Sequence, residues 1–376
     1  MPVTRELPTD EDRDLLELAR QLADRELRPR AAAAEQAAEF PRELMRVLGR
    51  SGLLGLPFPE DYGGGGVSYQ TYLQVLEELA GGWLSVALSI SVHTLSCYPL
   101  AAYGTDEQQK RWLPDMIGGE QLGAFCLSEP QAGSDAAALS TRAVRDGDDY
   151  VVNGVKAWIT HAGEADFYTL FVRTSDQHIS CLLADAATTG LLPQPREHKM
   201  GLTASPTAQL VLDDARIDAG RLIDAEGNGL QVALSALHGG RLGIAACAIG
   251  VAQAAFDYAL DYARGRRQFG RAVAEFQGMS FLLADLATAI EAGRSLYLRA
   301  AQLRDAGLPY RREAAMAKLF CTDTAMRVTT DAVQILGGAG YVEDHPVERW
   351  MREAKVTQIF EGTNQIQRVV IARDLI

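Results

Sequence analysis

The chain has 376 residues, 47% of them apolar, which is enough to bury a large core and predicts two or three domains at about 150 residues each. Its 36 basic and 49 acidic side chains give a net charge of −13, which argues against a general nucleic-acid-binding protein, because such a protein needs a basic surface. No uninterrupted apolar run approaches the roughly 18 residues of a membrane span. The amino terminus is acidic and helix-like and lacks the pattern of a secretory signal.

Several common site signatures are absent from the sequence. The five cysteines are far apart and form no C-x-x-C pair, which favours reduced thiols in a cytoplasmic protein. The six histidines have no metal-ligand spacing, so no metal site is expected. There is no P-loop, H-E-x-x-H or G-x-S-x-G motif. Nearly all basic residues are arginine, which is attributed to coding bias.

Residues 1–120 are expected to form a helical first domain. Thr9 and Thr105 each precede an acidic first turn and are predicted to be helix N-caps. Pro41 suits the first position of another helix, which Gly52 is expected to end.

Residues 121–228 have a sequence pattern typical of β-strands. Short β-branched and aromatic runs are separated by turn dipeptides such as Asp146-Gly147 and Asn153-Gly154. Closely spaced strands with such turns predict an antiparallel sheet or barrel. The expected strands include residues 150–152, 157–160, 167–172, 179–183 and 208–212.

Residues 229–376 return to long helices, expected over 241–264, 276–304 and 312–336. These segments carry apolar residues around much of their circumference, as helices buried in a bundle or at a subunit interface do. The predicted fold class is therefore α+β multidomain, with a helical domain, a β domain and a helical bundle in that order.

Three segments carry residues that are unusual for plain scaffolding. The strand and polar loop over 126–135 suit backbone donors facing a ligand, or an ordinary loop between domains. Strand alternation puts Trp158 and Thr160 on one face, where they could line a planar cofactor, although core packing is the commoner role of a lone tryptophan. Glu361 ends an apolar stretch, and desolvation there would raise its pKa as a general base requires. A solvated glutamate at a helix end is the alternative.

Together these segments resemble the acyl-CoA dehydrogenase family of flavoproteins, and the resemblance runs over nearly the whole chain. Many ordered motifs at family-like separations are more specific than any one of them. The resembling stretches are Tyr62-Gly63-Gly64, CLSEPQAGSD at 126–135, NGVKAWIT at 153–160, KMGLTASPTAQL at 199–210, the segment 239–270, QILGGAGY at 334–341, and the segment 345–368 with its IFEGTNQIQR ending.

The resemblance implies an N-terminal helical domain, a middle β domain and a C-terminal four-helix bundle, in a homotetramer that is a dimer of dimers. It also implies FAD as cofactor, an acyl-CoA substrate and reoxidation by electron-transferring flavoprotein. The implied reaction is the α,β-dehydrogenation of a short- to medium-chain or branched acyl-CoA to the trans-2-enoyl-CoA. A base removes the α-proton, and the β-hydrogen leaves as hydride to flavin N5.

The resemblance also assigns roles to residues. Glu361 matches the catalytic base, and its own N–H matches a donor to the thioester oxygen. Gly240 stands where some branches carry the base, and a glycine cannot act as one. Expected flavin-ring contacts are Phe125, Leu127, Ser128, Trp158 and Thr160. Expected contacts with the rest of FAD are Arg266, Gln268, Phe269, Gln277, Gln334, Gly337 and Gly338 across a subunit interface, with Thr363 and Gln365 at the last helix. Expected substrate contacts are Ser134, His238, Arg241 and Gly362.

Three positions depart from the family's usual pattern. His238 stands where an aspartate often contacts CoA, His161 replaces a common Asn or Ser, and Phe360 replaces a frequent Tyr, which makes the acyl pocket more apolar. An acyl-CoA oxidase, an enoyl-thioester reductase and a carrier-protein-tethered acyl dehydrogenase remain alternatives within the fold. A cofactor-free helical scaffold is an alternative of another class, and it would be colourless when purified.

Overall fold

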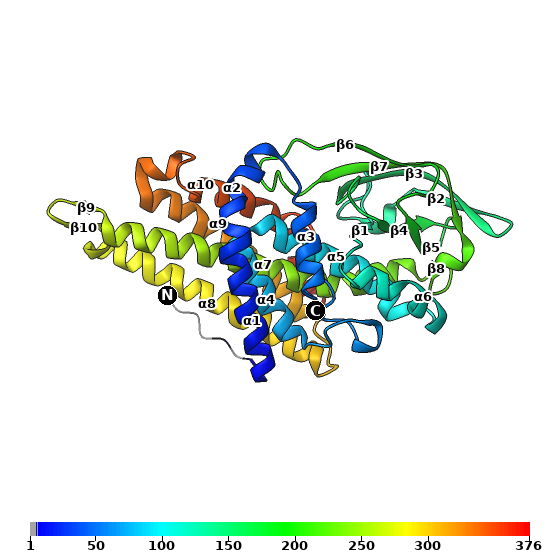
Figure 1. The fold of residues 1–376 in the computed structure, drawn as a ribbon, viewed down its shortest axis with the longest axis horizontal. Helices are drawn as coiled ribbons and strands as arrows, with labels where there is room; N and C mark the ends of the chain where they lie inside the picture. Colours follow the sequence, from blue (N-terminus) through cyan, green and yellow to red (C-terminus); the bar gives the residue numbers. More distant parts are fainter. Residues whose placement is uncertain (1–4, 6) are drawn as a thin grey trace.

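The structure, a computed structural model, describes residue 5 and residues 7–376. The first residues of the acidic, helix-like amino terminus, 1–4 and 6, therefore lie outside the described part of the chain. A sheet lies at one end of the molecule, and long helices extend from it to the other end (Figure 1). The predicted fold class is confirmed.

The N-terminal part is helical, and the two predicted N-caps, Thr9 and Thr105, are confirmed. Thr9 and Thr105 each accept a hydrogen bond from the backbone N–H three residues on, and in both cases the third residue's side chain accepts a bond in return. Pro41 is the N-cap of its helix instead of the first helical residue. The elements are α1 (Asp10–Leu22), a π-helical turn η1 (Ala23–Leu27), α2 (Arg28–Ala37), α3 (Arg42–Arg50), η2 (Glu60–Tyr62), α4 (Tyr69–Gly82), α5 (Leu84–Tyr103) and α6 (Asp106–Ile117).

The middle part is one sheet with strand order β6-β7-β3-β2-β4-β5-β8, and β1 pairs with β4. Most pairings are antiparallel, as predicted, but β1 and β2 each pair with β4 in parallel. The bounds are β1 (Gly123–Cys126), η3 (Ala136–Ala138), β2 (Arg142–Asp146), β3 (Asp149–Thr160), β4 (Phe167–Arg173), β5 (Ile179–Asp185), β6 (Leu191–Arg196), β7 (Thr207–Asp218), η4 (Ala219–Arg221) and β8 (Leu222–Ile223).

One of the two predicted turns is wrong. Asp146-Gly147 joins β2 to β3 as a hairpin, but Asn153-Gly154 lies inside the continuous strand β3 at a shift in its pairing with β7. Gly154 has φ of 151°, and a Cβ there would lie 2.5 Å from Thr141 Oγ1. The glycine therefore allows a bulge and a close approach of two chain segments, not a reversal of the chain.

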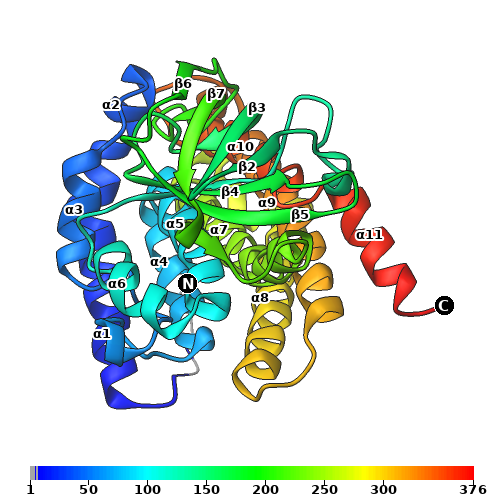
Figure 2. The same ribbon diagram turned by 90° about the vertical axis from the view of Figure 1, so that its right-hand side faces the viewer.

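The C-terminal part contains three long helices and two short ones. Helix α7 starts at Gly229, well before the predicted start at residue 241, because Gly239 and Gly240 lie inside a buried helix whose packing outweighs their low helix propensity. Figure 2 shows that the short last helix projects from the body. The elements are α7 (Gly229–Gly265), β9 (Arg267–Gln268), β10 (Arg271–Ala272), η5 (Val273–Glu275), α8 (Gln277–Asp305), α9 (Arg311–Leu336), η6 (Gly337–Tyr341), α10 (Val347–Ala354), η7 (Lys355–Gln358) and α11 (Asn364–Arg373).

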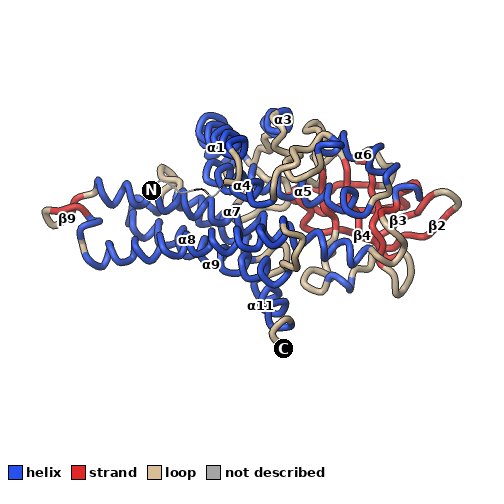
Figure 3. The backbone as a smooth tube through the Cα atoms, turned by 90° about the horizontal axis from the view of Figure 1, so that it is seen from below, coloured by secondary structure: helices blue, strands red, loops and turns tan. Residues whose placement is uncertain are grey.

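The core joins these parts. One apolar cluster runs through the N-terminal and C-terminal helices, and a second lies within the sheet. A third cluster packs Phe167 and Phe171 of the sheet against Leu100 and Leu113 of the helices. Helices α5 and α7 are long and apolar enough to cross a membrane, but 83% and 78% of their most apolar windows are buried in this core. Figure 3 shows helices and sheet meeting along α5 and α7.

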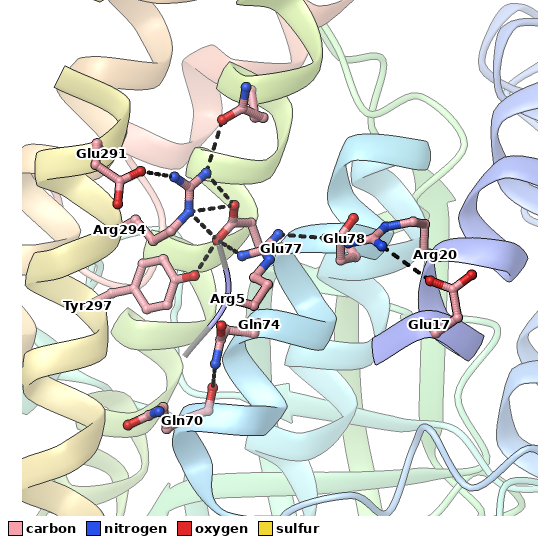
Figure 4. A network of polar contacts seen from close by, with 11 residues as sticks. Arg5, Glu17, Arg20, Gln70, Gln74, Glu77, Glu78, Glu291, Arg294 and Tyr297 are labelled. Carbon is pink, nitrogen blue, oxygen red and sulfur yellow. Dashed lines mark hydrogen bonds and ion pairs between the residues drawn. The ribbon is translucent and has the colours of Figure 1, made fainter. Parts of the chain in front are cut away.

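A buried charge network ties the N-terminal segment to both helical parts (Figure 4). The Glu77 carboxylate of α4 accepts hydrogen bonds from Arg5 at 2.8 Å, from Arg294 of α8 at 2.8 Å, and from the Tyr297 hydroxyl. Burial alone would raise the pKa of Glu77, but the two guanidinium groups outweigh it and hold that pKa at about 2. Folding therefore favours ionised Glu77, and this contribution is present above pH 4.5 and is lost as the pH falls toward 2.

Replacing Glu77 with Gln should lower the free energy of unfolding by about 3–5 kcal/mol, because two buried guanidinium groups lose their carboxylate. Urea unfolding at pH 7 measures this loss. Glu291→Gln is the matched control, since Glu291 also pairs with Arg294 but its side chain is 66% exposed, and it should cost less than about 1 kcal/mol. Equal losses in the two variants would contradict the account of the network.

Candidate active site

Glu361 lies in a short, tightly held loop between η7 and α11. Its φ is 51°, and that of Gly362 is 87°, so two successive residues are left-handed. Gln367 Nε2 donates to the Gly362 carbonyl at 2.7 Å, and Thr363 caps α11 by accepting from the Ile366 N–H at 3.2 Å. The positive φ at a non-glycine residue is strained, and the hydrogen bonds around it hold it there.

The Glu361 carboxylate lies against the backbone of α7. A Cβ built on Gly240 would be 2.1 Å from Glu361 Oε2, so any side chain at position 240 would displace the carboxylate. Both carboxylate oxygens are buried, and neither has a hydrogen-bond partner among the described residues. A buried, unpartnered carboxylate in a native protein needs an explanation, and a functional site is one of the few available.

The protonation of Glu361 follows from this position. Burial raises the pKa of Glu361 to about 7, against the smaller opposing effects of the Lys318 and Arg241 charges. A carboxylate with such a pKa can accept a proton near neutral pH far more effectively than an ordinary glutamate. The solvated helix-end alternative for Glu361 is therefore wrong, because its oxygens are shielded from water.

Lys318 of α9 holds the Glu361 loop through hydrogen bonds, and no motif in the sequence predicts these contacts. It is fully buried, and its Nζ donates to the Gly362 carbonyl at 3.0 Å and to Asn364 Oδ1 at 2.8 Å. Asn364 in turn donates to Thr322 Oγ1 at 2.9 Å. Burial lowers the pKa of Lys318 to about 7. This lysine thus fixes the backbone on the carboxyl side of Glu361 and places a titratable cation next to it.

Two of the expected substrate contacts lie one helical turn apart on α7. Arg241 is 4% exposed, and its Nε and Nη1 are buried without a partner among the described residues. His238 lies 6.2 Å from the Tyr310 ring, and burial together with the Arg241 and Arg311 charges lowers the pKa of His238 to about 4. Unpartnered cationic and anionic groups therefore share this end of the site.

A buried ion pair shapes the loop after β1. Lys156 Nζ lies 2.7 Å from Glu129 Oε1, with both side chains at most 1% exposed. Glu129 also accepts from the Ser140 and Thr141 N–H groups at 2.6 and 3.0 Å. Burial would raise the pKa of Glu129, but Lys156 dominates and brings it to about 2. The pair fixes the loop that carries the expected contacts Leu127 and Ser128, while Ser134 is exposed farther along it.

Of the expected flavin-ring contacts, Phe125 lies in β1, Leu127 and Ser128 in this loop, and Trp158 and Thr160 at the end of β3. The Ser128 carbonyl accepts from the Ala157 N–H at 2.9 Å, which brings the two segments together. Trp158 is 57% exposed although it is a large aromatic residue, and Thr160 is partly exposed. Phe125 packs against Phe171 with ring centres 4.9 Å apart. Core packing therefore does not account for Trp158.

His161 links the same segments. It is fully buried, and its Nδ1 donates to the Gly123 carbonyl at 2.8 Å, while the Gly123 N–H donates to His93 Nδ1 at 3.0 Å. Burial lowers the pKa values of His161 and His93 to about 4 and 3, so both rings are neutral at pH 7. This departure from the family pattern is a structural link between β3, β1 and α5.

The other expected FAD contacts fall into two groups. Thr363 and Gln365 line a cavity of about 380 Å³ at the start of α11. Arg266, Gln268 and Phe269 lie on the hairpin at the end of the molecule away from the sheet (Figures 1 and 3), so one chain does not bring them to Trp158. Phe269 is 94% exposed. Gln277, Gln334, Gly337 and Gly338 are also exposed, at the ends of α8 and α9.

Comparisons with known proteins agree over the whole chain. Three family models match: the acyl-CoA dehydrogenase N-terminal domain at residues 9–120, the middle domain at 124–215 and the C-terminal domain at 227–376. A short-chain-specific acyl-CoA dehydrogenase of Clostridium acetobutylicum is 41% identical over 97% of both chains.

Solved structures give the same result. Butyryl-CoA dehydrogenase from Megasphaera elsdenii is 39% identical with a TM-score of 0.96, covering 99% of this chain and 100% of its own. A chain from a study of the electron transferring flavoprotein of Acidaminococcus fermentans is 40% identical with a TM-score of 0.97, over 99% of this chain and 100% of that one.

Replacing Lys318 with Met should raise the pH at which Glu361 titrates by about one unit or more, because a nearby opposite charge is removed. Difference infrared spectroscopy follows the carboxyl C=O band, which is assigned by its loss in Glu361→Gln. Lys110→Met, at an exposed lysine on α6, is the control and should leave the titration unchanged. An unchanged titration in Lys318→Met would refute the coupling.

Proposed function

The chain belongs to the acyl-CoA dehydrogenase family, and we propose that it oxidises short-chain, straight or branched acyl-CoA thioesters to trans-2-enoyl-CoA, with Glu361 as the base. The observation that carries this proposal is the buried Glu361 carboxylate, whose two oxygens have no partner among the described residues. The similarity to short-chain-specific and butyryl-CoA dehydrogenases supports a short acyl group in the substrate. The oxidase, reductase and carrier-tethered alternatives have no comparable support.

Members of this family depend on FAD, and the residues of this chain fit it. Trp158 offers an exposed flat face beside Thr160, and the α11 cavity combines a helix N-terminus with the Thr363 and Gln365 side chains. We assign Phe125, Leu127, Ser128, Trp158 and Thr160 to the flavin ring, and Thr363 and Gln365 to the remainder of FAD. When bound, FAD accepts the substrate's β-hydrogen as hydride.

Glu361 takes the α-proton in this proposal. The α-C–H of a thioester is a weak acid, so the base must be ionised, desolvated and fixed in place. Gly240 leaves room for the carboxylate, and the Lys318 and Gln367 contacts hold the loop that carries it. A pKa near 7 keeps about half of the carboxylate ionised at neutral pH and makes the protonated form a reasonable product.

The remaining groups bind the thioester. As the proton leaves, negative charge develops on the thioester oxygen, and the Glu361 N–H is assigned as one donor to it. Arg241, Ser134 and Gly362 are assigned to the substrate side. His238 is neutral at pH 7 and stands where the family often has an aspartate. The proposed CoA site therefore has an uncharged imidazole, and no carboxylate, at position 238.

We further propose that the active form is a homo-oligomer, a tetramer built as a dimer of dimers, in the cytoplasm, and that electron-transferring flavoprotein reoxidises it. The exposed residues Phe269 and Tyr341, at 94% and 86%, suit an interface between copies. Arg266, Gln268, Gln277, Gln334, Gly337 and Gly338 would then hold the FAD of the neighbouring copy. A molar mass of one chain for the FAD-loaded protein would contradict this arrangement.

Replacing Glu361 with Gln should leave FAD bound and the protein yellow, but slow flavin bleaching by butyryl-CoA by about 10²- to 10⁴-fold. Anaerobic stopped-flow absorbance measures this rate. Glu343→Gln, at an exposed glutamate, is the control and should bleach at the wild-type rate. Wild-type bleaching by Glu361→Gln would rule out the base assignment, and a colourless wild-type protein would rule out the enzyme.

A further inference from the structure

A cavity of about 150 Å³ opens beside the Glu361 carboxylate, and its walls show what kind of acyl group it suits. It begins at Gly240, which contacts Glu361, and continues between α4, α5 and α7. At about 30 Å³ for each water-sized group, it holds roughly five non-hydrogen atoms. Its lining residues include Phe58, Tyr69, Ser91, Leu95, Tyr98 and Arg304.

Arg304 of α8 is the one charged residue among the described residues that line this cavity, and no carboxylate lines it. The guanidinium carbon lies 3.3 Å from the centre of the Tyr69 ring. The Tyr69 hydroxyl donates to the Gly239 carbonyl at 2.9 Å, which fixes the ring as a platform. Arg304 is thus held in place by stacking on Tyr69.

One amino group of Arg304 is left unused. Its Nη1 is buried and has no hydrogen-bond partner among the described residues. A Cβ built on Gly239 would lie 3.2 Å from this Nη1, while one built on the next residue, Gly240, would lie 2.1 Å from Glu361 Oε2. Arg304 and the base therefore lie against successive residues of α7, Gly239 and Gly240, both of which line the cavity.

Arg304 is partly exposed, but an arginine stays charged at every physiological pH, and its buried Nη1 without a partner is costly unless a ligand pairs with it. Arginine binds carboxylates especially well, because its planar fork matches the two oxygens. A straight apolar acyl chain would fill this cavity without satisfying Nη1.

We propose that Arg304, stacked on Tyr69, binds a carboxylate at the far end of the acyl group, so that the preferred substrates are CoA monothioesters of short dicarboxylic acids. This inference rests on the proposed function and narrows its substrate class. Beyond the β-carbon, a five-carbon dicarboxylyl group places one methylene and a carboxylate, four non-hydrogen atoms, in a space for about five. The terminal carboxylate binds and does not react, so the α-proton still passes to Glu361.

The test compares two thioesters with the same number of non-hydrogen atoms on the FAD-loaded enzyme. Glutaryl-CoA ends in a carboxylate, and 5-methylhexanoyl-CoA has two methyl groups in place of its oxygens. Anaerobic stopped flow gives the second-order rate constant of flavin reduction for each. We expect the wild type to favour glutaryl-CoA by at least about 10-fold, and Arg304→Met to lower this preference by about 10- to 100-fold.

Further variants distinguish the loss of the Arg304 charge from a general loss of folding. Arg304→Gln is a second neutral variant and should lose the preference as Arg304→Met does, while Arg304→Lys should keep part of it. Arg312→Met, at an exposed arginine paired with Glu313, is the control and should keep all of it. A wild type that favours 5-methylhexanoyl-CoA, or an unchanged preference in both neutral variants, would overturn the proposal.

Butyryl-CoA keeps the two proposals distinguishable, because it has no group for Arg304 to bind. Flavin reduction by butyryl-CoA in the wild type supports the proposed function whatever the outcome with glutaryl-CoA. If butyryl-CoA and both longer thioesters leave the flavin oxidised, the proposed function itself fails.

Discussion

The Glu361 carboxylate lies against bare backbone at Gly240, and the organisation of the site depends on that contact. A side chain at position 240 would occupy the position of the carboxylate. The contact removes water from a charged group, which raises its pKa to about 7, and it needs a backbone with φ of 51° at Glu361. The desolvated carboxylate and the left-handed backbone both lower the stability of the protein, so contacts elsewhere in the fold must hold Glu361 in this conformation.

Two buried lysines hold the two loops of the site. Lys318 binds the loop that carries Glu361, and Lys156 binds Glu129 in the loop that carries Leu127 and Ser128. The chain has a net charge of −13, yet its site contains three buried cations, Lys156, Arg241 and Lys318, and the partly exposed Arg304. Local charge at specific positions, and not the overall balance, determines what this site can bind.

The fold was largely predictable from the sequence, because helix signals are local. The predicted N-caps Thr9 and Thr105 depend on residues within one helical turn and are confirmed, and the structure adds the reciprocal bond of a capping box at each. Asn153-Gly154 was wrong because the same dipeptide suits a hairpin and a bulge, and only the pairing of β3 with β7 distinguishes them. The early start of α7 depends on packing around its glycines, which no local pattern contains. The domain boundaries at residues 120 and 228 remain predictions.

The site was predictable only in part. Family-like motifs identified Glu361, but neither Lys318 nor Arg304 stands in a motif that suggests its contacts. A lysine in a chain whose basic residues are nearly all arginine was an available signal, since two of the five lysines are fully buried at the site. The role proposed for Arg304 could not be predicted from the sequence, because it depends on a cavity formed by α4, α5 and α7.

The central claim is that a buried Glu361, with a pKa near 7, removes the α-proton. The most direct measurement is the pH dependence of the second-order rate constant for anaerobic flavin reduction by butyryl-CoA, since this quantity reports the essential groups of the free enzyme. The account predicts that the rate constant falls tenfold per pH unit below about pH 7. A rate constant that stays level from pH 8.5 down to pH 5.5, with FAD still bound, would contradict it.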